Sequence, residues 1–478
     1  MNEATRISLL NRTVQNLREV WREVADRTSG VFSASPAPSL GDKDVEPIKT
    51  QMRDCLEARG GEVSARARAA NLGRTYLSLN PQGRRRFLQI LVDDFGPDHE
   101  AVDRAMAELQ KVGHDPLETI EAEQNLRQFL RPPWLRLLTQ FNGLPEGVHF
   151  LVDLRAELLD FCKDDPKLAV LEKELKTLLA SWFDVGFLEM QALNWDSPAS
   201  LLEKLIAYEA VHAIQSWDDL KNRLDADRRC FAFFHPRMPH EPLIFVEVAL
   251  VNGIADNIQN LLDQQAPVMD PYWADTAIFY SISNAQAGLA GISFGSFLIK
   301  RVVDVLADEF RNLKVFATLS PIPGFCSWLN GRLKAPAEDL ESKLLTGSER
   351  KALYALDLEP SKKGILKTLL ERPDWHKKPE FAKALKSPLM RLCAHYLVEE
   401  KRPDGIALDR VAHFHLSNGA RIERLNWLGN TSTEGLRQSV GIMVNYRYKL
   451  DDIEANHEAY TGEKRVKVSS AMRGLLRS

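Results

Sequence analysis

A strand, a glycine turn and a helix follow one another in the middle of the chain. Residues 276–283 form an aromatic and β-branched run that is typical of a buried strand, and Gly288, Gly291 and Gly295 follow it. From Phe294 onward the apolar residues recur at helical spacing. Such a turn presents backbone N–H groups and the positive end of the helix dipole to a ligand. The pattern therefore predicts a phosphate site.

A serine and two histidines further along the chain could carry out catalysis. A second strand, residues 314–319, ends at Ser320, which precedes a rigid Pro-Ile-Pro turn. Ser320 could cap that turn or serve a site at the strand end. His413 and His415 lie in residues 412–420, which we expect to be a strand, so that only one of the two can face a site.

A second serine lies inside the glycine turn. The run from Gly291 to Gly295 has the form G-x-S-x-G, the nucleophile elbow of α/β hydrolases, with Ser293 as its serine. That elbow requires several parallel strands before it and an acid ahead of its histidine. The preceding chain is largely helical, and no acid stands out. The pattern therefore favours Ser293 as a loop residue and keeps a serine nucleophile as the alternative.

Five motifs occur in the order used by a known family. They are SISNAQAGLAGISFGSFLIKRVV, LSPIPGF, PLMRLCAHYL, HFHLSNGA and VNYRY, and they resemble the motifs of the malonyl-CoA decarboxylases. The resemblance extends over roughly the whole chain and is strongest from about Trp182 onward. It implies the conversion of malonyl-CoA to acetyl-CoA and CO2. It also implies that a coenzyme A thioester lies across the glycine loop of a domain similar to the N-acetyltransferase fold.

The resemblance also implies which residues form the site. It selects Ser320 and His415 as a catalytic dyad. Tyr448 and Ser281 match further positions that line the site, although from the residues alone they could be a strand aromatic and a strand-end hydroxyl. The substrate-binding positions that it implies are Ser281, Ala290, Gly291, Ile292, Ser293, Phe294, Gly295, Ser296, Ile299 and Tyr448.

The implied reaction has clear chemical requirements. Loss of CO2 leaves a thioester enolate, and because the thioester carbonyl is itself the electron sink we expect no metal and no organic cofactor. The protein must stabilise the oxyanion and protonate the α-carbon. We expect His415 to donate that proton with a pKa near neutrality, and Ser320 to bind the leaving carboxylate and to hydrogen-bond to His415. Backbone amides near residues 290–296 or on the neighbouring strand are the expected oxyanion donors.

Two other functions remain open from the sequence. One is an acyl-CoA thioester hydrolase or acyltransferase with a serine nucleophile, and the other is a non-catalytic acyl-CoA sensor. The products formed from malonyl-CoA distinguish the three. A decarboxylase of this kind would serve malonate use or fatty acid metabolism.

Composition restricts the partners and the compartment. The net charge of -4 gives no general attraction to nucleic acid or to an anionic membrane surface, so malonyl-CoA and acetyl-CoA are the expected partners. The 5 cysteines are scattered and form no CxxC pair, which favours reduced thiols. We find no apolar run long enough for a membrane span and no secretory signal, and we expect a cytoplasmic protein.

The fold class expected is α+β. An all-helical domain, residues 1–190, would contain a mobile Pro- and Ser-rich linker at 30–47. An N-acetyltransferase-like catalytic α/β domain with a mixed sheet would follow, at residues 191–478. Because the helical half shows no catalytic cluster, we expect it to package or oligomerise the other half. A homo-oligomer, either a dimer or a tetramer, is therefore expected.

Overall fold

The chain forms two compact units. The computed structural model describes residues 15–25, 36–57, 61–113, 115–183, 185–292, 298–333, 344–356 and 364–477. The first unit comprises Met1–Glu189, Phe233–Ile244 and Asn284–Phe294, and the second comprises Met190–Ala232, Phe245–Ser283 and Gly295–Ser478. Helices come first and a mixed sheet follows, which is the α+β class that the sequence predicts.

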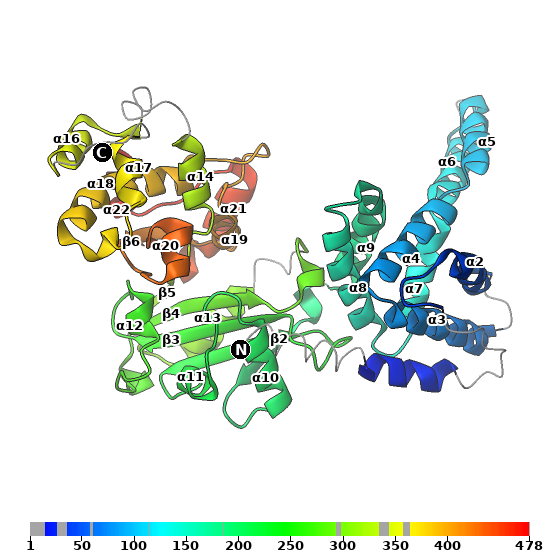
Figure 1. Cartoon of the computed structure of the whole chain (residues 1–478), viewed down its shortest axis with the longest axis horizontal. Helices are drawn as coiled ribbons and strands as arrows, with labels where there is room; N and C mark the ends of the chain where they lie inside the picture. The colour runs from blue at the N-terminus through cyan, green and yellow to red at the C-terminus, as the bar shows by residue number, and fades with distance from the viewer. Residues whose placement is uncertain are drawn as a thin grey trace. The chain divides into compact units, whose positions relative to one another are not determined.

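The first unit is built from helices (Figure 1). A helix at residues 15–25 precedes them. The others are α2 (Asp42–Leu56), α3 (Gly61–Ser78), α4 (Pro81–Asp94), α5 (His99–Lys111), α6 (Pro116–Leu130), α7 (Pro133–Asn142), α8 (Gly147–Phe161) and α9 (Ala169–Trp182). Helices α5 and α6 lie side by side as a hairpin.

Capping residues explain where several of these helices begin. The side chain of Asn80 accepts a hydrogen bond from the N–H of Gly83 at the start of α4, and Pro81 occupies the first helical position. Asp115 and Pro116 repeat this arrangement at α6. Proline is suited to this position because its missing N–H would have had no partner in the helix.

An aromatic cluster forms the core of the first unit. Phe150 of α8 meets the rings of Trp21, Tyr76 and Phe141, with centroid distances of 4.8, 5.7 and 5.1 Å. The indole N–H of Trp21 donates to the carbonyl of Pro145 at 2.7 Å, so its polar atom is satisfied within this core.

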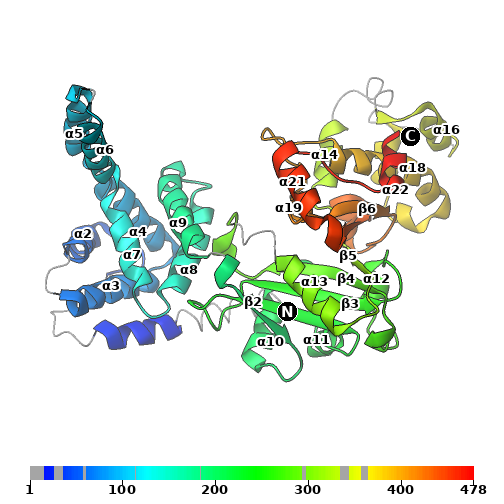
Figure 2. The same ribbon diagram turned by 180° about the vertical axis from the view of Figure 1, so that it is seen from behind.

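The described residues form a seven-stranded sheet of order β1-β2-β3-β4-β5-β7-β6 (Figures 1 and 2). Strand β4 pairs in parallel with β5, whereas β7 is antiparallel to both β5 and β6, so the sheet is mixed. The strands are β1 (Glu189–Leu193), β2 (Arg228–Phe234), β3 (Ile244–Val251), β4 (Thr276–Asn284), β5 (Val315–Thr318), β6 (Arg421–Asn426) and β7 (Met443–Tyr448).

The remaining helices belong to the second unit. They are α10 (Ala199–Tyr208), α11 (Trp217–Arg223), α12 (Ile258–Leu261), α13 (Leu298–Glu309), α14 (Phe325–Arg332), α16 (Gly347–Tyr354), α17 (Ile365–Leu370), α18 (Pro379–Val398), α19 (Arg410–Ser417), α20 (Thr433–Ser439), α21 (Ile453–Glu463) and α22 (Ser470–Arg477). Figures 1 and 2 both show the helices after β5 gathered beside β6. No helix among the described segments is long and apolar enough to cross a bilayer.

The alternation of side chains along β4 separates an apolar face from a polar one. Ile278 and Tyr280 pack with Leu319, Met443 and residues of α12 in a buried hydrophobic cluster. Because successive side chains of a strand point to opposite faces, Phe279 and Ser281 lie on the other face. That second face carries the candidate site.

Candidate active site

Ser320 is positioned by the strand that follows it in the sheet. Its N–H donates to the carbonyl of Val444 at 2.8 Å, and the N–H of Val444 donates back to Ser320 at 3.0 Å. This bridge continues the pairing of β5 with β7 beyond the end of β5. The hydroxyl of Ser320 therefore lies on the same face as Thr318, two residues earlier.

His415 lies on a helix, so the strand that we expected at residues 412–420 is wrong. Helix α19 begins after Asp409, whose carboxylate accepts the N–H groups of Val411 and Ala412 at 2.9 and 3.0 Å. Residues two apart on a helix still point in different directions, and the two histidines do so. His413 Nδ1 lies 3.0 Å from the hydroxyl of Tyr460, whereas His415 faces the sheet.

The structure brings the two predicted dyad residues together. His415 Nε2 lies 3.1 Å from Ser320 Oγ, and His415 Nδ1 lies 2.8 Å from the hydroxyl of Tyr448. The imidazole also stacks on the ring of Tyr446, with the two centroids 4.5 Å apart. All four side chains are buried. The imidazole is therefore fixed by contacts at both nitrogens and at one face.

The direction of these hydrogen bonds assigns the tautomer of His415. Ser320 Oγ donates to Thr318 Oγ1 at 2.8 Å, so the Ser320 oxygen has only lone pairs to offer to His415. His415 Nε2 must then carry the proton that it shares with Ser320. His415 Nδ1 is unprotonated in this tautomer and accepts the hydroxyl proton of Tyr448.

Burial makes His415 a weak base in the free protein. Desolvation lowers the pKa of the imidazole to about 3, because burial disfavours the protonated, charged form. The pKa near neutrality that we expected from the sequence is therefore wrong for the free protein. Burial raises the pKa of the Tyr448 hydroxyl well above its usual value, so both partners are neutral at physiological pH.

Residues from two of the sequence motifs meet Asp409, which caps the helix of His415. A side chain at Gly324, in LSPIPGF, would lie 2.1 Å from the hydroxyl of Tyr396, in PLMRLCAHYL. The same tyrosine donates to Asp409 at 3.3 Å, and the N–H of Gly324 donates to Asp409 at 3.4 Å. Asp409 therefore links the cap of the His415 helix to the turn that follows Ser320.

Ser281 lies on the same sheet face, one strand away from Ser320. Phe279 pairs with Thr318, and Ser281 and Ser320 each lie two residues further along their strands. The hydroxyl of Ser281 donates to both carboxylate oxygens of Glu209, at 2.8 and 2.7 Å. Glu209 could not be found from the sequence, because it is one of many acids and follows α10 with no motif around it.

Glu209 is also a structural anchor. Its carboxylate accepts the N–H groups of Val211 and His212 at 2.8 and 2.7 Å and the hydroxyl of Ser283 at 3.0 Å. The Glu209 side chain is buried, and its negative charge is stabilised by these donors. It holds the hydroxyl of Ser281 in one orientation.

The glycine turn lies partly outside the described residues. Ser293, Phe294, Gly295 and Ser296, which the resemblance assigns to substrate binding, are among the residues that are not described. Ala290, Gly291 and Ile292 belong to the first unit. Ala290 and Gly291 are exposed, and Ile292 is buried. Ile299 belongs to the second unit and is buried on α13.

The described part of this turn packs closely against the first unit. Gly288 lies against α8, because a side chain there would lie 1.8 Å from the carbonyl oxygen of Val152. The N–H groups of Leu289, Ala290 and Ile292 donate to carbonyls within the turn at 3.0 to 3.1 Å. Gly291, with φ of +72°, keeps its N–H without a partner among the described residues. The turn therefore offers fewer free amides than its glycine content suggests.

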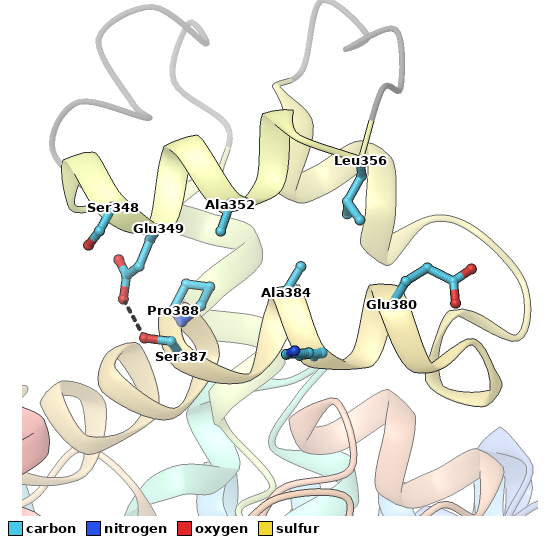
Figure 3. A pocket seen from close by; sticks show the side chains of 9 residues that line it. Ser348, Glu349, Ala352, Leu356, Glu380, Ala384, Ser387 and Pro388 are labelled. Atoms are coloured by element: carbon cyan, nitrogen blue, oxygen red, sulfur yellow. Dashed lines mark hydrogen bonds between the residues drawn. The ribbon is translucent and has the colours of Figure 1, made fainter.

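A separate hollow lies between α16 and α18 (Figure 3). It has a volume of about 460 Å³, and the residues lining it include Ala352, Leu356, Ala384 and Pro388. One of its two carboxylates, Glu349, is already paired with Arg391 at 2.7 Å. None of the predicted site residues lines this hollow, so we do not assign it to the reaction.

Two family models match the chain. The malonyl-CoA decarboxylase N-terminal domain matches residues 95–183, and the malonyl-CoA decarboxylase C-terminal domain matches residues 186–478. The mitochondrial malonyl-CoA decarboxylase of Anser anser anser is 41% identical over 470 residues, covering 95% of this chain and 93% of the relative. That of Rattus norvegicus is 38% identical, covering 92% of this chain and 88% of the relative.

Solved structures of malonyl-CoA decarboxylases also match the chain. The crystal structure of malonyl-CoA decarboxylase from Rhodopseudomonas palustris matches with a TM-score of 0.81 and 41% identity, covering 90% of this chain and 99% of that one. The structure from Agrobacterium vitis matches with a TM-score of 0.79 and 40% identity, covering 90% and 99% of the two chains. The chain belongs to the malonyl-CoA decarboxylase family.

Proposed function

We infer that this protein is a carboxy-lyase that converts malonyl-CoA to acetyl-CoA and CO2. The observation that carries this inference is the buried series of hydrogen bonds Tyr448–His415–Ser320–Thr318, in a chain that belongs to the malonyl-CoA decarboxylase family. This series of hydrogen bonds places the hydroxyl of Ser320 and the imidazole N–H of His415 side by side on one face of the sheet.

Each residue of the dyad has one role in this reaction. Ser320 binds the carboxylate of malonyl-CoA by turning its hydroxyl proton from Thr318 to the substrate. The negative charge of that carboxylate raises the pKa of the adjacent imidazole, so His415 takes up a proton when the substrate binds. The C–C bond breaks, CO2 leaves, and the electron pair is delocalised into the thioester enolate. His415 then gives its proton to the α-carbon.

The same geometry argues against Ser320 as a nucleophile. A nucleophilic serine donates its proton to the base that activates it. Here Ser320 donates to Thr318, and His415 Nε2 is the donor toward Ser320. Incubation of the purified protein with malonyl-CoA, followed by mass analysis, tests the function. Acetyl-CoA is the expected product, whereas free CoA with malonate would indicate the hydrolase and unchanged substrate the sensor.

We propose that the reaction needs neither a metal nor an organic cofactor, since the thioester carbonyl accepts the electron pair. Dialysis against a chelator should leave the turnover unchanged. We also propose that the second unit is similar to the N-acetyltransferase fold. The mixed sheet with a parallel β4–β5 pair at its centre supports this.

We propose a cytoplasmic homo-oligomer, a dimer or tetramer, in which residues 1–190 serve assembly. All 5 cysteines are free thiols, which supports a reducing compartment. Light scattering of the full chain tests the assembly, and a single-chain mass would contradict it. We further propose that neither nucleic acid nor a membrane is a partner, which the net charge of -4 supports.

A further inference from the structure

One carboxylate joins the helix that carries His415 to the turn that follows Ser320. Asp409 is buried, and its Oδ1 accepts two N–H groups in the first turn of α19, at 2.9 and 3.0 Å. Its Oδ2 faces the turn, where it accepts the N–H of Gly324 at 3.4 Å and the hydroxyl of Tyr396 at 3.3 Å. The two oxygens of one side chain thus contact the supports of both members of the dyad.

Both segments that meet at Asp409 are stiff. Two prolines restrict the backbone between Ser320 and Gly324. On the other side, a single helix leads from Asp409 to His415, which lies six residues further on, about 9 Å along the helix axis. A change of position at Asp409 is therefore passed on to both members of the dyad.

Few contacts set the distance between these two segments. Among the described residues, hydrogen bonds join α19 and its cap to residues 320–324 at two points, which are the dyad itself and Asp409. The far end of α19 is held by a different element, because His457 Nδ1 on α21 lies 2.6 Å from the carbonyl oxygen of Ser417. Within the described chain, Asp409 is thus the hydrogen-bonding contact outside the dyad that fixes the helix to the Ser320 turn.

The close approach at this point requires a glycine. A Cβ atom at Gly324 would lie 2.1 Å from the hydroxyl oxygen of Tyr396, so a larger residue would push the turn and the tyrosine apart. Tyr396 is held in place, because its ring packs against Phe325 and Trp328 at centroid distances of 5.8 and 5.4 Å. The turn, the tyrosine and the carboxylate of Asp409 therefore fit together in one arrangement.

We propose that Asp409 is a positioning residue for the decarboxylation, which holds His415 Nε2 within hydrogen-bond reach of Ser320. This proposal rests on the proposed function, because the step that it serves is the proton transfer from His415. A general acid works only within about 2.6 to 3.2 Å of its partner, and a misplacement of about 1 Å can cost a hundredfold in rate. Asp409 acts through the helix and the turn, so its loss should lower kcat and leave substrate binding intact.

Asp409→Asn separates the cap of α19 from the link to the turn. Asparagine is as good an N-cap as aspartate, so its amide oxygen still accepts the first N–H groups of the helix. The amide nitrogen that replaces Oδ2 is a donor, and it cannot accept from Gly324 or Tyr396. We expect kcat to fall about ten- to hundredfold, whereas KM for malonyl-CoA should change less than about twofold.

Asp98→Asn is the matched control, because it makes the same change at another N-cap. Asp98 is exposed at the start of α5, and within the described chain its carboxylate accepts only two N–H groups of its own helix, at 3.1 and 3.2 Å. This variant should keep the kcat of the parent within about twofold. It corrects for the lost charge and for any change in capping strength.

A pair of variants tests the fit at Gly324 independently, and it decides the matter if Asp409→Asn fails to fold. Gly324→Ala should lower kcat, because its methyl group meets the hydroxyl of Tyr396. Adding Tyr396→Phe removes that oxygen, and the next nearest atoms lie 3.3 and 3.4 Å away, which a small shift accommodates. The double variant should therefore turn over severalfold faster than Gly324→Ala. A merely destabilised protein would show additive losses, which would contradict the proposal.

Crystal structures of the parent and of Asp409→Asn measure the positioning directly. Ser320 Oγ and His415 Nε2 should be hydrogen-bonded in the parent and more than about 3.5 Å apart in the variant. An unchanged distance, or a kcat for Asp409→Asn equal to that of Asp98→Asn, would overturn the proposal. The distance is measured without turnover, so a parent that makes no acetyl-CoA would count against the proposed function and not against the positioning of the dyad.

Discussion

The hydroxyl of Tyr448 lies 2.8 Å from Nδ1 of His415, on the side of the imidazole opposite Ser320. Because this phenol stays protonated, it can serve as the donor that fixes the Nε2–H tautomer. A proton carried on Nε2 faces Ser320, where the substrate carboxylate is expected. The hydrogen bond from Tyr448 thus decides which nitrogen can deliver a proton.

Tyr448→Phe should therefore slow turnover. Loss of one oriented hydrogen bond to the imidazole should lower kcat about tenfold or more, while coenzyme A affinity is retained. Tyr446→Phe is the control, because Tyr446 also contacts His415 but its hydroxyl has no partner among the described residues. Steady-state kinetics of the two variants checks this. Equal activities would show that the tautomer is not set by Tyr448.

Thr318 provides a second test, because it accepts the proton of Ser320. Thr318→Val removes that acceptor, so Ser320 should turn its proton toward His415 and reverse the bond between them. We expect kcat to fall about tenfold, and Thr318→Ser, which keeps the hydroxyl, to restore it. A nucleophilic serine predicts the reverse, since the turned proton would favour its activation. Unchanged or raised turnover in Thr318→Val would support that alternative.

The low pKa of His415 predicts how stability depends on pH. The pKa is about 3 in the folded protein, below the value of about 6.5 in an unfolded chain. The contribution of the neutral imidazole is fully present above pH 6.5 and is lost as the pH falls from there toward 3. Between pH 7 and pH 5 the parent should lose about 2 kcal/mol more unfolding free energy than His415→Gln. Denaturant unfolding at both pH values measures this, and equal losses would show that His415 is not buried as a neutral group.

Glu209 should be needed to hold Ser281. Glu209→Gln removes a charge that accepts hydrogen bonds from two amides and two hydroxyls, so we expect a stability loss of about 1 to 3 kcal/mol. Turnover should fall as well if Ser281 contacts the substrate. The control is Glu458→Gln on α21, which removes an exposed carboxylate. A stability loss as small as that of the control would contradict the anchoring role.

Strong local patterns made much of the fold predictable. The runs at 276–283 and 314–319 form β4 and β5 in the structure, as expected, because β-branched and aromatic residues dominate them. The strand predicted at residues 412–420 is wrong, because the alternating pattern HFH is compatible with a strand and equally with a short capped helix. The cap at Asp409, which decides between the two, lies just before the motif. The short strand β1 had no such signal.

The sequence motifs predicted the central residues of the candidate site. They did not predict the residues that hold those side chains in place. Ser320, His415 and Tyr448 come together as the resemblance implied. The contacts of Glu209 with Ser281 and Ser283 depend on tertiary packing between segments that are far apart in the sequence. The pKa of His415 also depends on burial, which the sequence of one segment does not reveal.

The most direct test of the proposed mechanism is turnover in D2O, with rapid quenching and mass analysis of both product and protein. We predict acetyl-CoA with one deuterium on its methyl carbon and no added mass on the peptide that contains Ser320, because His415 supplies a solvent-derived proton to a free enolate. His415→Ala should lose about 10²- to 10⁴-fold in rate. A malonyl or acetyl adduct on Ser320, or full activity in His415→Ala, would contradict the mechanism.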